Sequence, residues 1–327
     1  MADPERTPRE ASERFEEALS EIRGAVIGGQ SFFEDVLLGI MARGHVLMED
    51  VPGTGKTLTA RTFADVFGLE FSRIQFTPDL LPADITGTSI FNEGTNEFEF
   101  QPGPIFANVV LADEINRAPP KTQAAMLEAM AERQVTVEGE TRDLPEPFFV
   151  IATQNPIEQE GTFPLPEAQV DRFMVKTELG YPDKDGEVEL LRRRAGRVDQ
   201  IPAAEQVLSG GEEVISLQEV PESVHVDDDV LDYVAEIARR TREDSRVRVG
   251  VSPRGTQRLF EAARARAVIE GRAYATPGDV KAVARPVLAH RIVLTAEAQV
   301  GDGDKDEIVR DVLDAVSVPT VEAPAEA

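Results

Sequence analysis

The feature that most constrains this chain is a six-residue loop, PGTGKT, at residues 52–57. The apolar run HVLMED at 45–50 precedes it, and a segment with helical character follows it. A strand, a glycine-rich loop ending in Lys-Thr and a helix together form a phosphate-binding loop. Gly53 and Gly55 would let backbone N–H groups approach phosphate oxygens, and the helix dipole would add to the anion site. The loop therefore predicts a nucleotide site within an α/β fold.

The side chains of this loop have expected roles in binding ATP with Mg²⁺. Lys56 would reach the β- and γ-phosphates, and the Thr57 hydroxyl would ligate Mg²⁺. The residues expected around the phosphates are Pro52, Gly53, Thr54, Gly55, Lys56, Thr57 and Leu58. The pattern G-x-x-x-x-G-K-[ST] is broken at one position, where Asp50 replaces the first glycine. Because that position precedes the tight part of the loop, the prediction of a nucleotide site stands.

A second apolar run, NVVLAD at 108–113, ends in two adjacent carboxylates. At the end of a buried strand, Asp113 would hold the Mg²⁺ shell, and Glu114 could polarise a water that attacks the γ-phosphate. A simpler interpretation is that these acids cap the helix that follows Pro119-Pro120. Together with the phosphate loop, however, they favour Mg²⁺-dependent hydrolysis of ATP to ADP and phosphate.

The order of apolar runs predicts a three-layer α/β domain with a parallel sheet. Buried strands are expected at 45–50, 108–113 and 147–155, and helices at about 15–25 and across 31–44. Helical segments between the runs would cover both faces of the sheet. This alternation is the pattern of a P-loop nucleotide-binding core.

Other segments depart from that alternation. The stretches 88–100 and 133–144 alternate around polar turns and predict two β-hairpin insertions. Beyond about 180 only helical patterns occur, apart from a polar segment at 195–220 that we expect to be irregular. The predicted organisation is a flexible tail at 1–14, an α/β core at 15–180, an all-α lid domain at 181–315 and a disordered acidic tail at 316–327.

Composition limits the chemistry further. The chain has no cysteine, which excludes disulfides and thiol chemistry, and its three histidines are far apart in sequence. Its formal net charge is −26, and only six of its 34 basic residues are lysine. Such a surface resembles that of a protein from a salt-accumulating archaeon, although an acidic mesophilic surface is the simpler alternative. Nucleic acid is not an expected partner. The apolar runs are too short for a signal peptide or membrane span, so a cytoplasmic location is expected.

These motifs resemble those of the AAA+ ATPases. Val26-Ile27-Gly28 looks like the segment that packs against adenine in that superfamily, and Asn155 matches its sensor-1 residue. An Asn-Pro turn is the simpler interpretation of Asn155 alone. The stretch GTFPLPEAQVDRF at 161–173, with DEINRAPPK and ATQNPIEQE upstream, resembles the MoxR family closely. The resemblance covers about residues 12 to 315, and the two hairpins match the clade that also contains magnesium chelatase subunits and MCM helicases.

The resemblance assigns roles to three arginines. Arg172 occupies the arginine-finger position and would reach the nucleotide of a neighbouring subunit; a surface pair with Asp171 is the simpler interpretation. Arg254 matches sensor 2 of the lid. It follows an expected N-cap, Ser252, and a cation in the first turn opposes the helix dipole unless an anion such as the γ-phosphate lies near. Arg117 could face the subunit boundary, or only solvent.

Three functions are compatible with this pattern. The resemblance implies first a homo-oligomeric ring, a hexamer, that remodels or matures partner proteins, often ones with von Willebrand factor A domains. A DNA-translocating motor of the MCM type is the second possibility, but the expected hairpin tips carry mainly acidic residues, which argues against gripping phosphates. A metal-chelatase motor subunit is the third, and it ranks lower because 161–173 is closer to MoxR proteins.

Overall fold

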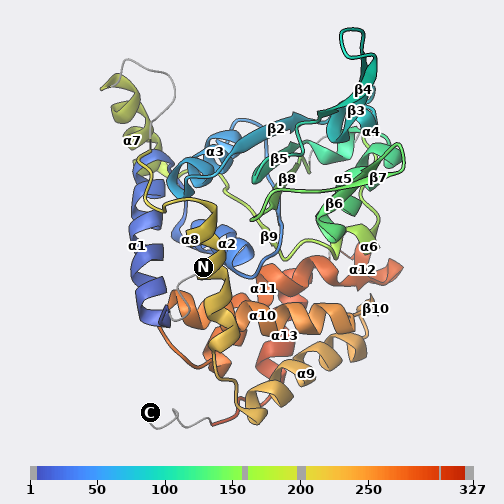
Figure 1. Cartoon of the computed structure of the whole chain (residues 1–327). Helices are drawn as coiled ribbons and strands as arrows, with labels where there is room; N and C mark the ends of the chain where they lie inside the picture. The colour runs from blue at the N-terminus through green and yellow to red at the C-terminus, as the bar shows by residue number, and fades with distance from the viewer. Residues whose placement is uncertain (1–5, 157–160, 197–203, 302, 321–327) are drawn as a thin grey trace.

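In a computed structural model, described for residues 6–156, 161–196, 204–301 and 303–320, a parallel sheet of five strands forms the centre of the α/β core. The strand order is β2-β5-β8-β1-β9 (Figure 1). The strands are β1 (Val46–Glu49), β2 (Phe71–Gln75), β5 (Val109–Asp113), β8 (Phe149–Gln154) and β9 (Val175–Thr177). The three predicted strands are therefore confirmed as β1, β5 and β8.

The sequence pattern missed the two outer strands, β2 and β9. Only Ile74 is buried in β2, and β9 has three residues, so neither forms the continuous apolar run of a central strand. All five residues of β5, by contrast, are buried. Central parallel strands are covered on both faces, which is why their sequences are apolar throughout.

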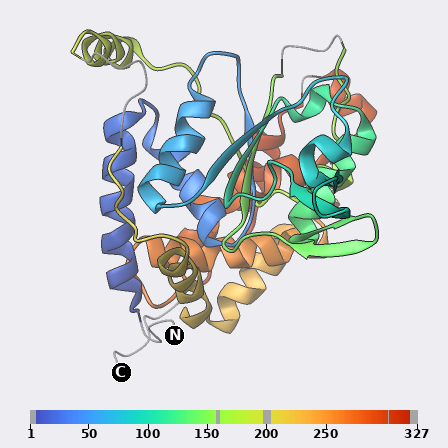
Figure 2. The same ribbon diagram turned by 45° about the horizontal axis from the view of Figure 1, so that its top comes forward.

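Helices cover both faces of the sheet, which makes the predicted three layers (Figure 2). One core cluster joins the sheet to α1 (Pro8–Ala25), α2 (Gln30–Met41) and α3 (Lys56–Phe67). The other joins it to α5 (Pro120–Glu132). Residues of β1 alternate between the clusters, with Val46 and Met48 in the first and Leu47 in the second. This alternation is the two-residue period of a strand.

The two predicted hairpins are present. One consists of β3 (Gly87–Asn92) and β4 (Glu97–Pro102), after the short helix α4 (Pro82–Thr86). The other consists of β6 (Gln134–Val137) and β7 (Glu140–Asp143). Its turn residues Glu138 and Gly139 have φ values of 54° and 86°, the left-handed pair of a type I′ turn.

The region after residue 180 is helical but not entirely so. Its helices are α7 (Lys184–Ala195), α8 (Gly211–Glu219), α9 (Asp228–Glu243), α10 (Pro253–Ile269), α11 (Pro277–Leu288), α12 (Ala296–Val300) and α13 (Lys305–Ala315). A short antiparallel pair, β10 (Val247–Val249) with β11 (Val293–Leu294), joins two of its loops. The expectation of an all-α lid is corrected in this respect.

Two further expectations were wrong. Residues 8–14, predicted as a flexible tail, form the first two turns of α1, because Thr7 and Glu10 make a reciprocal capping box. Part of the segment 195–220, predicted as irregular, forms α8, whose Val214 and Leu217 are fully buried. Residues 316–320 follow α13 without helix or strand, and 1–5 and 321–327 lie outside the described residues. No helix among the described residues is long and apolar enough to cross a bilayer.

Candidate nucleotide-binding site

The predicted phosphate loop connects β1 to α3. Gly53 and Gly55 have φ values of 86° and 102°, which side-chain-bearing residues rarely adopt, and Gly55 is the N-cap of α3. Lys56 donates from Nζ to the carbonyl oxygens of Asp50 (2.8 Å) and Val51 (2.9 Å), so its ammonium lies over the loop. Thr57, in the first turn of α3, is half-buried. The loop thus has the left-handed glycines, the lysine and the helix N-terminus that phosphate binding requires.

Asp50, the residue that breaks the glycine pattern, holds the loop in place. Its side chain is buried, and Oδ1 accepts a hydrogen bond from the backbone N–H of Val51 (2.8 Å). Oδ2 accepts from the N–H groups of Leu179 (3.1 Å) and Gly180 (3.0 Å), just beyond β9. A carboxylate at this position therefore fastens the phosphate loop to the segment that leads into α7.

The predicted adenine segment lies beside the phosphate loop. A Cβ built on Gly28 would lie 2.4 Å from Leu179 Cδ1, and one built on Gly55 would lie 3.9 Å from Leu179 Cδ2. Ile27 lies near the start of α7, since a Cβ added to Gly186 would lie 3.3 Å from its Cγ2. Val26 is buried as the C-cap of α1. Leu179 thus lies near both Gly28 and Gly55, so the predicted adenine segment is close to the phosphate loop.

Asp113 ends β5 in a network of hydrogen bonds. Its Oδ1 accepts from Thr153 Oγ1 (2.7 Å) on β8, and its Oδ2 accepts from Arg73 Nη2 (2.5 Å) and Nε (3.1 Å) on β2. Asp113 is 7% exposed. The guanidinium therefore neutralises a buried carboxylate at the position where a metal ligand is predicted.

Glu114, the predicted water-polarising carboxylate, has φ 57° and ψ 49°. Its backbone N–H donates to Thr153 Oγ1 (2.8 Å), and its Oε2 accepts from Gln75 Nε2 (2.9 Å). Oε2 also lies 3.2 Å from Arg117 Nε, so Arg117 forms an ion pair within its own chain. Gln75 and Arg117 thus hold the side chain of Glu114, and Thr153 holds its backbone.

Asn155 comes directly after β8, between the ends of β1 and β5 in the strand order. It is half-buried, at the same sheet edge as Asp113 and the phosphate loop, because the strands are parallel. The structure therefore brings Lys56, Thr57, Asp113 and Asn155 to one edge. Residues 157–160, in the ATQNPIEQE stretch, lie outside the described residues.

The donors at this edge fit Mg²⁺. Thr57 and Asp113 offer oxygen ligands, and Mg²⁺ typically takes one or two protein oxygens and completes its shell with water and substrate phosphates. Within the described part of the chain, no group of three or more His, Cys, Asp or Glu could enclose a metal ion.

Arg172 lies at the other end of the sheet. The backbone N–H of Met174 donates to the carbonyl of His45 (2.8 Å), so the residues before β9 are level with the start of β1. The five residue-to-residue steps from His45 to Asp50 span roughly 16 Å at about 3.3 Å per step. Arg172 donates from Nη1 to Leu127 O (2.8 Å) and lines a surface hollow of about 550 Å³. The expected alternative, a pair with Asp171, is not seen, because Asp171 pairs instead with Arg291 (3.0 Å).

Arg254, which the sequence predicts to contact a phosphate in its own chain, lies near that same end of the sheet. Ser252 caps α10 as predicted, by accepting from the N–H of Gly255 (3.1 Å). A Cβ on Gly255 would lie 3.0 Å from Arg291 Cδ, and Arg291 donates to Phe173 O (2.5 Å) just before β9. Arg254 is exposed, and among the described residues no hydrogen bond or ion pair joins it to the phosphate loop. Lid packing, which sequence spacing does not encode, decides this position.

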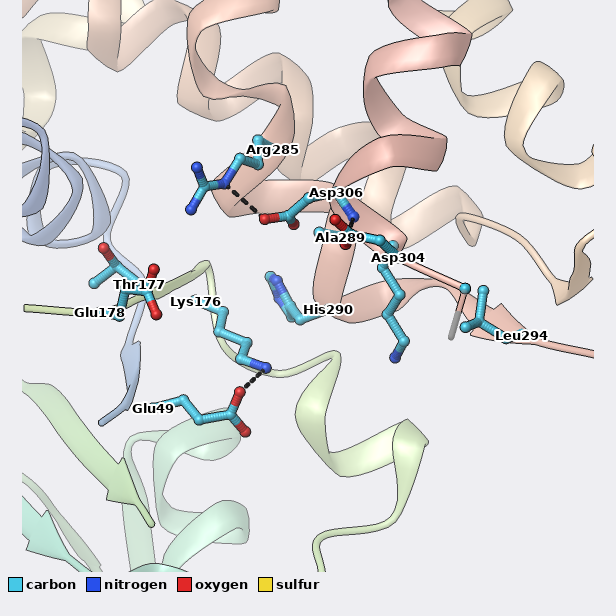
Figure 3. Close-up of a pocket in the computed structure, with 12 residues that line it drawn as sticks. Glu49, Lys176, Thr177, Glu178, Arg285, Ala289, His290, Leu294, Asp304 and Asp306 are labelled. Carbon is cyan, nitrogen blue, oxygen red and sulfur yellow. Dashed lines mark hydrogen bonds and ion pairs between the residues drawn. The ribbon is translucent and has the colours of Figure 1, made fainter. Parts of the chain in front are cut away.

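A cavity of about 400 Å³ lies between the core and the lid (Figure 3). Glu49 and Lys176, on the neighbouring strands β1 and β9, form an ion pair at its floor, and Arg285 pairs with Asp306 (3.0 Å) on the lid side. The imidazole of His290 projects between these two pairs. Glu49 directly precedes Asp50, so this cavity adjoins the root of the phosphate loop.

Several residues of the site could not be found by motif. Two of them, Arg73 and Gln75, lie on β2, and Thr153 lies on β8, the two strands that flank β5. Only the strand register brings them to Asp113 and Glu114. In the sequence, only a position near the end of a strand could have indicated these residues, and β2 itself was not predicted. Asp50 was visible as a departure from the glycine pattern, but its partners are about 130 residues away.

Comparisons with known proteins agree with this geometry. A family model of the ATPase family associated with various cellular activities (AAA) matches residues 45–175, and an AAA lid domain model matches residues 239–312. The chain is 47% identical to uncharacterized protein YeaC of Bacillus subtilis over 302 residues, which is 92% of this chain and 94% of that one. It is 44% identical to chaperone MoxR1 of Mycobacterium tuberculosis over 317 residues, or 94% and 83% of the two chains.

A solved structure agrees as well. The crystal structure of a putative ATPase from Cytophaga hutchinsonii superposes with a TM-score of 0.87 at 39% identity, over 95% of this chain and 96% of that one. Sequence relatives and fold thus point to one family across nearly the whole length. The chain belongs to the MoxR family of AAA ATPases.

Proposed function

We propose that this AAA ATPase works as a homo-oligomeric ring, a hexamer, in which each subunit completes the site of its neighbour. The observation that carries the proposal is the separation of the catalytic groups. Lys56, Asp113 and Glu114 lie at the carboxyl ends of the strands, whereas Arg172 and Arg254 lie towards the amino ends. An arginine at the far end of the sheet would reach a γ-phosphate only in another copy.

Within one site, each residue has a defined task. Lys56 and the N-terminus of α3 hold the phosphates, and Ile27 and Gly28 contact the base. Bound Mg²⁺, held through Thr57 and Asp113, would neutralise charge that develops on the phosphate oxygens.

The remaining groups act on the attacking water and on the charge of the transition state. Glu114 orients the water and takes its proton, with Asn155 positioning it against the γ-phosphate. Arg172 and Arg254 of the adjacent subunit would stabilise the negative charge of the transition state.

We further propose that hydrolysis drives the remodelling or maturation of partner proteins, including ones with von Willebrand factor A domains. One relative, chaperone MoxR1, covers 94% of this chain, and its name supports the chaperone part of this proposal. The two hairpins argue against the DNA motor. The β3–β4 hairpin exposes Glu93, Glu97 and Glu99. In the β6–β7 hairpin the single arginine, Arg142, pairs with Glu140 (2.5 Å). The hypothesis of a metal-chelatase motor subunit also accounts for the hairpins, but no further observation favours it. A cytoplasmic location is part of the proposal.

The test is the ATPase rate per subunit against protein concentration in molar KCl, with and without single-stranded DNA. We expect a rate that climbs with concentration and ignores DNA, since assembly would complete the site. Lys56→Ala and Glu114→Gln serve as controls that should abolish turnover. Stimulation by DNA would favour the motor instead, and full turnover in Lys56→Ala would refute the assigned site.

A further inference from the structure

The β3–β4 hairpin carries an aromatic face that the rest of the chain covers only in part. Directly opposed residues share a face, so Phe91 and Phe98 lie on the same side as Phe100 and its partner Ser89. The opposite side carries Ile90 with Glu99 and Asn92 with Glu97. The hairpin extends away from the core at the top of Figure 1. It is thus a two-sided ribbon, aromatic on one face and acidic on the other.

Near the base of the ribbon, this aromatic face has partners. Phe100 packs edge-on against Phe106 with ring centroids 5.7 Å apart. The guanidinium of Arg142, from the second hairpin, lies 4.0 Å from the centroid of Phe100. The chain therefore covers this ring with an arginine, in a cation–π contact.

Nearer the turn, the same face is open. Phe91 and Phe98 contact each other edge-on at 5.3 Å, yet they are 46% and 73% exposed. Two adjacent exposed phenylalanines are costly in water and often mark a surface that binds a protein. The backbone beneath them is paired without a break, from Gly87 opposite Pro102 at the base to Asn92 opposite Glu97 at the turn.

Charge indicates what kind of partner fits this face. Glu93 lies in the turn, Glu97 and Glu99 lie on the opposite face of the same two-stranded ribbon, and no lysine or arginine lies in residues 87–102, so the hairpin as a whole is negatively charged. A second copy of this chain, with net charge −26, would bring mostly like charge. A basic segment would be attracted by the negative charge of this ribbon and would gain stacking on the rings, as Arg142 does on Phe100.

We propose that Phe91 and Phe98 bind an arginine-bearing extended segment of a client protein, with a guanidinium stacked on the rings as Arg142 is on Phe100. This inference rests on the proposed action on partner proteins and names the chemistry that this action would select. Arginine is preferred to lysine, because its planar guanidinium stacks on aromatic faces and is weakly hydrated.

The test measures binding of a fluorescein-labelled peptide that alternates arginine with leucine to the full chain, by fluorescence anisotropy in molar KCl. High salt screens generic attraction to an acidic protein. We expect Phe91→Ala/Phe98→Ala to bind about tenfold more weakly, and a lysine version of the peptide to bind less well than the arginine version. Ile90→Ala is the matched control, since Ile90 is 50% exposed on the opposite face of the same hairpin, and it should change little.

Two further measurements make the outcome decisive. Basal ATPase activity should be unchanged in all variants. A wild-type protein that hydrolyses ATP but does not bind the peptide would refute this inference alone. A wild-type protein that does not hydrolyse ATP would refute the proposed function. Phe98→Leu, which keeps an apolar side chain, should lose the preference for arginine over lysine. Equal losses in Ile90→Ala and the double variant, or a change in oligomeric state by light scattering in the double variant, would overturn the assignment.

Discussion

At the scale of single residues, Thr153 connects the two carboxylates of the site. Its buried hydroxyl donates to Asp113 and accepts from the N–H of Glu114. We predict that Thr153→Val, which has nearly the same shape, lowers the free energy of unfolding by about 1–3 kcal/mol because two buried polar partners are left unsatisfied. It should also reduce kcat, since the backbone of Glu114 would lose the hydroxyl that holds its N–H group.

Thr153→Ser is the matched control for this prediction, because it keeps the hydroxyl and loses only a methyl group. Chemical denaturation and steady-state ATPase assays would measure both quantities. Wild-type turnover in Thr153→Val would show that Thr153 does not position Glu114.

At the scale of elements, Glu213 fastens α8 to α1. Its carboxylate accepts from Arg6 (2.9 Å), Arg14 (3.0 Å) and the N–H of Ser209 (2.7 Å). Burial alone would raise the pKa of Glu213, but the hydrogen bonds from Arg14, Ser209 and Arg6 lower it to about 2. A lowered pKa in the folded state stabilises the protein above the unfolded value near 4.5, and this stabilisation is lost as the pH falls towards 2.

Glu213→Gln should therefore lower the free energy of unfolding by about 2 kcal/mol at pH 7, after allowance for the partly exposed arginines. The difference from the wild type should shrink as the pH falls below 4.5. Glu212→Gln, an exposed neighbour in the same turn of α8, is the control and should have little effect. A pH-independent difference would mean that the charge of Glu213 is not what holds α8.

Some features of the fold and of the site could be predicted from local sequence, and others could not. The phosphate loop, Asp113-Glu114 and the type I′ turn at Glu138-Gly139 are local, because their chemistry is decided by neighbours in sequence. The start of α1 was locally encoded too, in Thr7 and Glu10, but its capping signal was overlooked. The Asp50 contact with Leu179 and the position of Arg254 depend on how distant segments pack, and no local pattern carries that information.

At the scale of the whole molecule, the net charge of −26 should make stability depend on salt. Repulsion among carboxylates acts over a Debye length of about 10 Å at 0.1 M salt and about 3 Å at 1 M. We predict a melting temperature that rises steadily with KCl from low to molar concentration, measured by circular dichroism. A melting temperature that stays constant or falls would show that the acidic surface is not adapted to salt.

Arg172 and the phosphate loop lie at opposite ends of the sheet, so a site completed by the neighbouring subunit can be tested directly with two variants. Lys56→Ala has an intact Arg172, and Arg172→Ala has an intact phosphate loop. Mixed rings would contain interfaces at which the loop of one variant faces the arginine of the other. With random mixing of equal amounts, roughly a quarter of the interfaces would be competent.

The measurement we would make first is the ATPase rate of these two variants, separately and mixed, at a concentration where light scattering shows assembly. We predict little turnover from either variant alone and a clear recovery on mixing. No recovery in assembled mixtures, or near-normal turnover by Arg172→Ala alone, would contradict an arginine supplied by the neighbouring subunit.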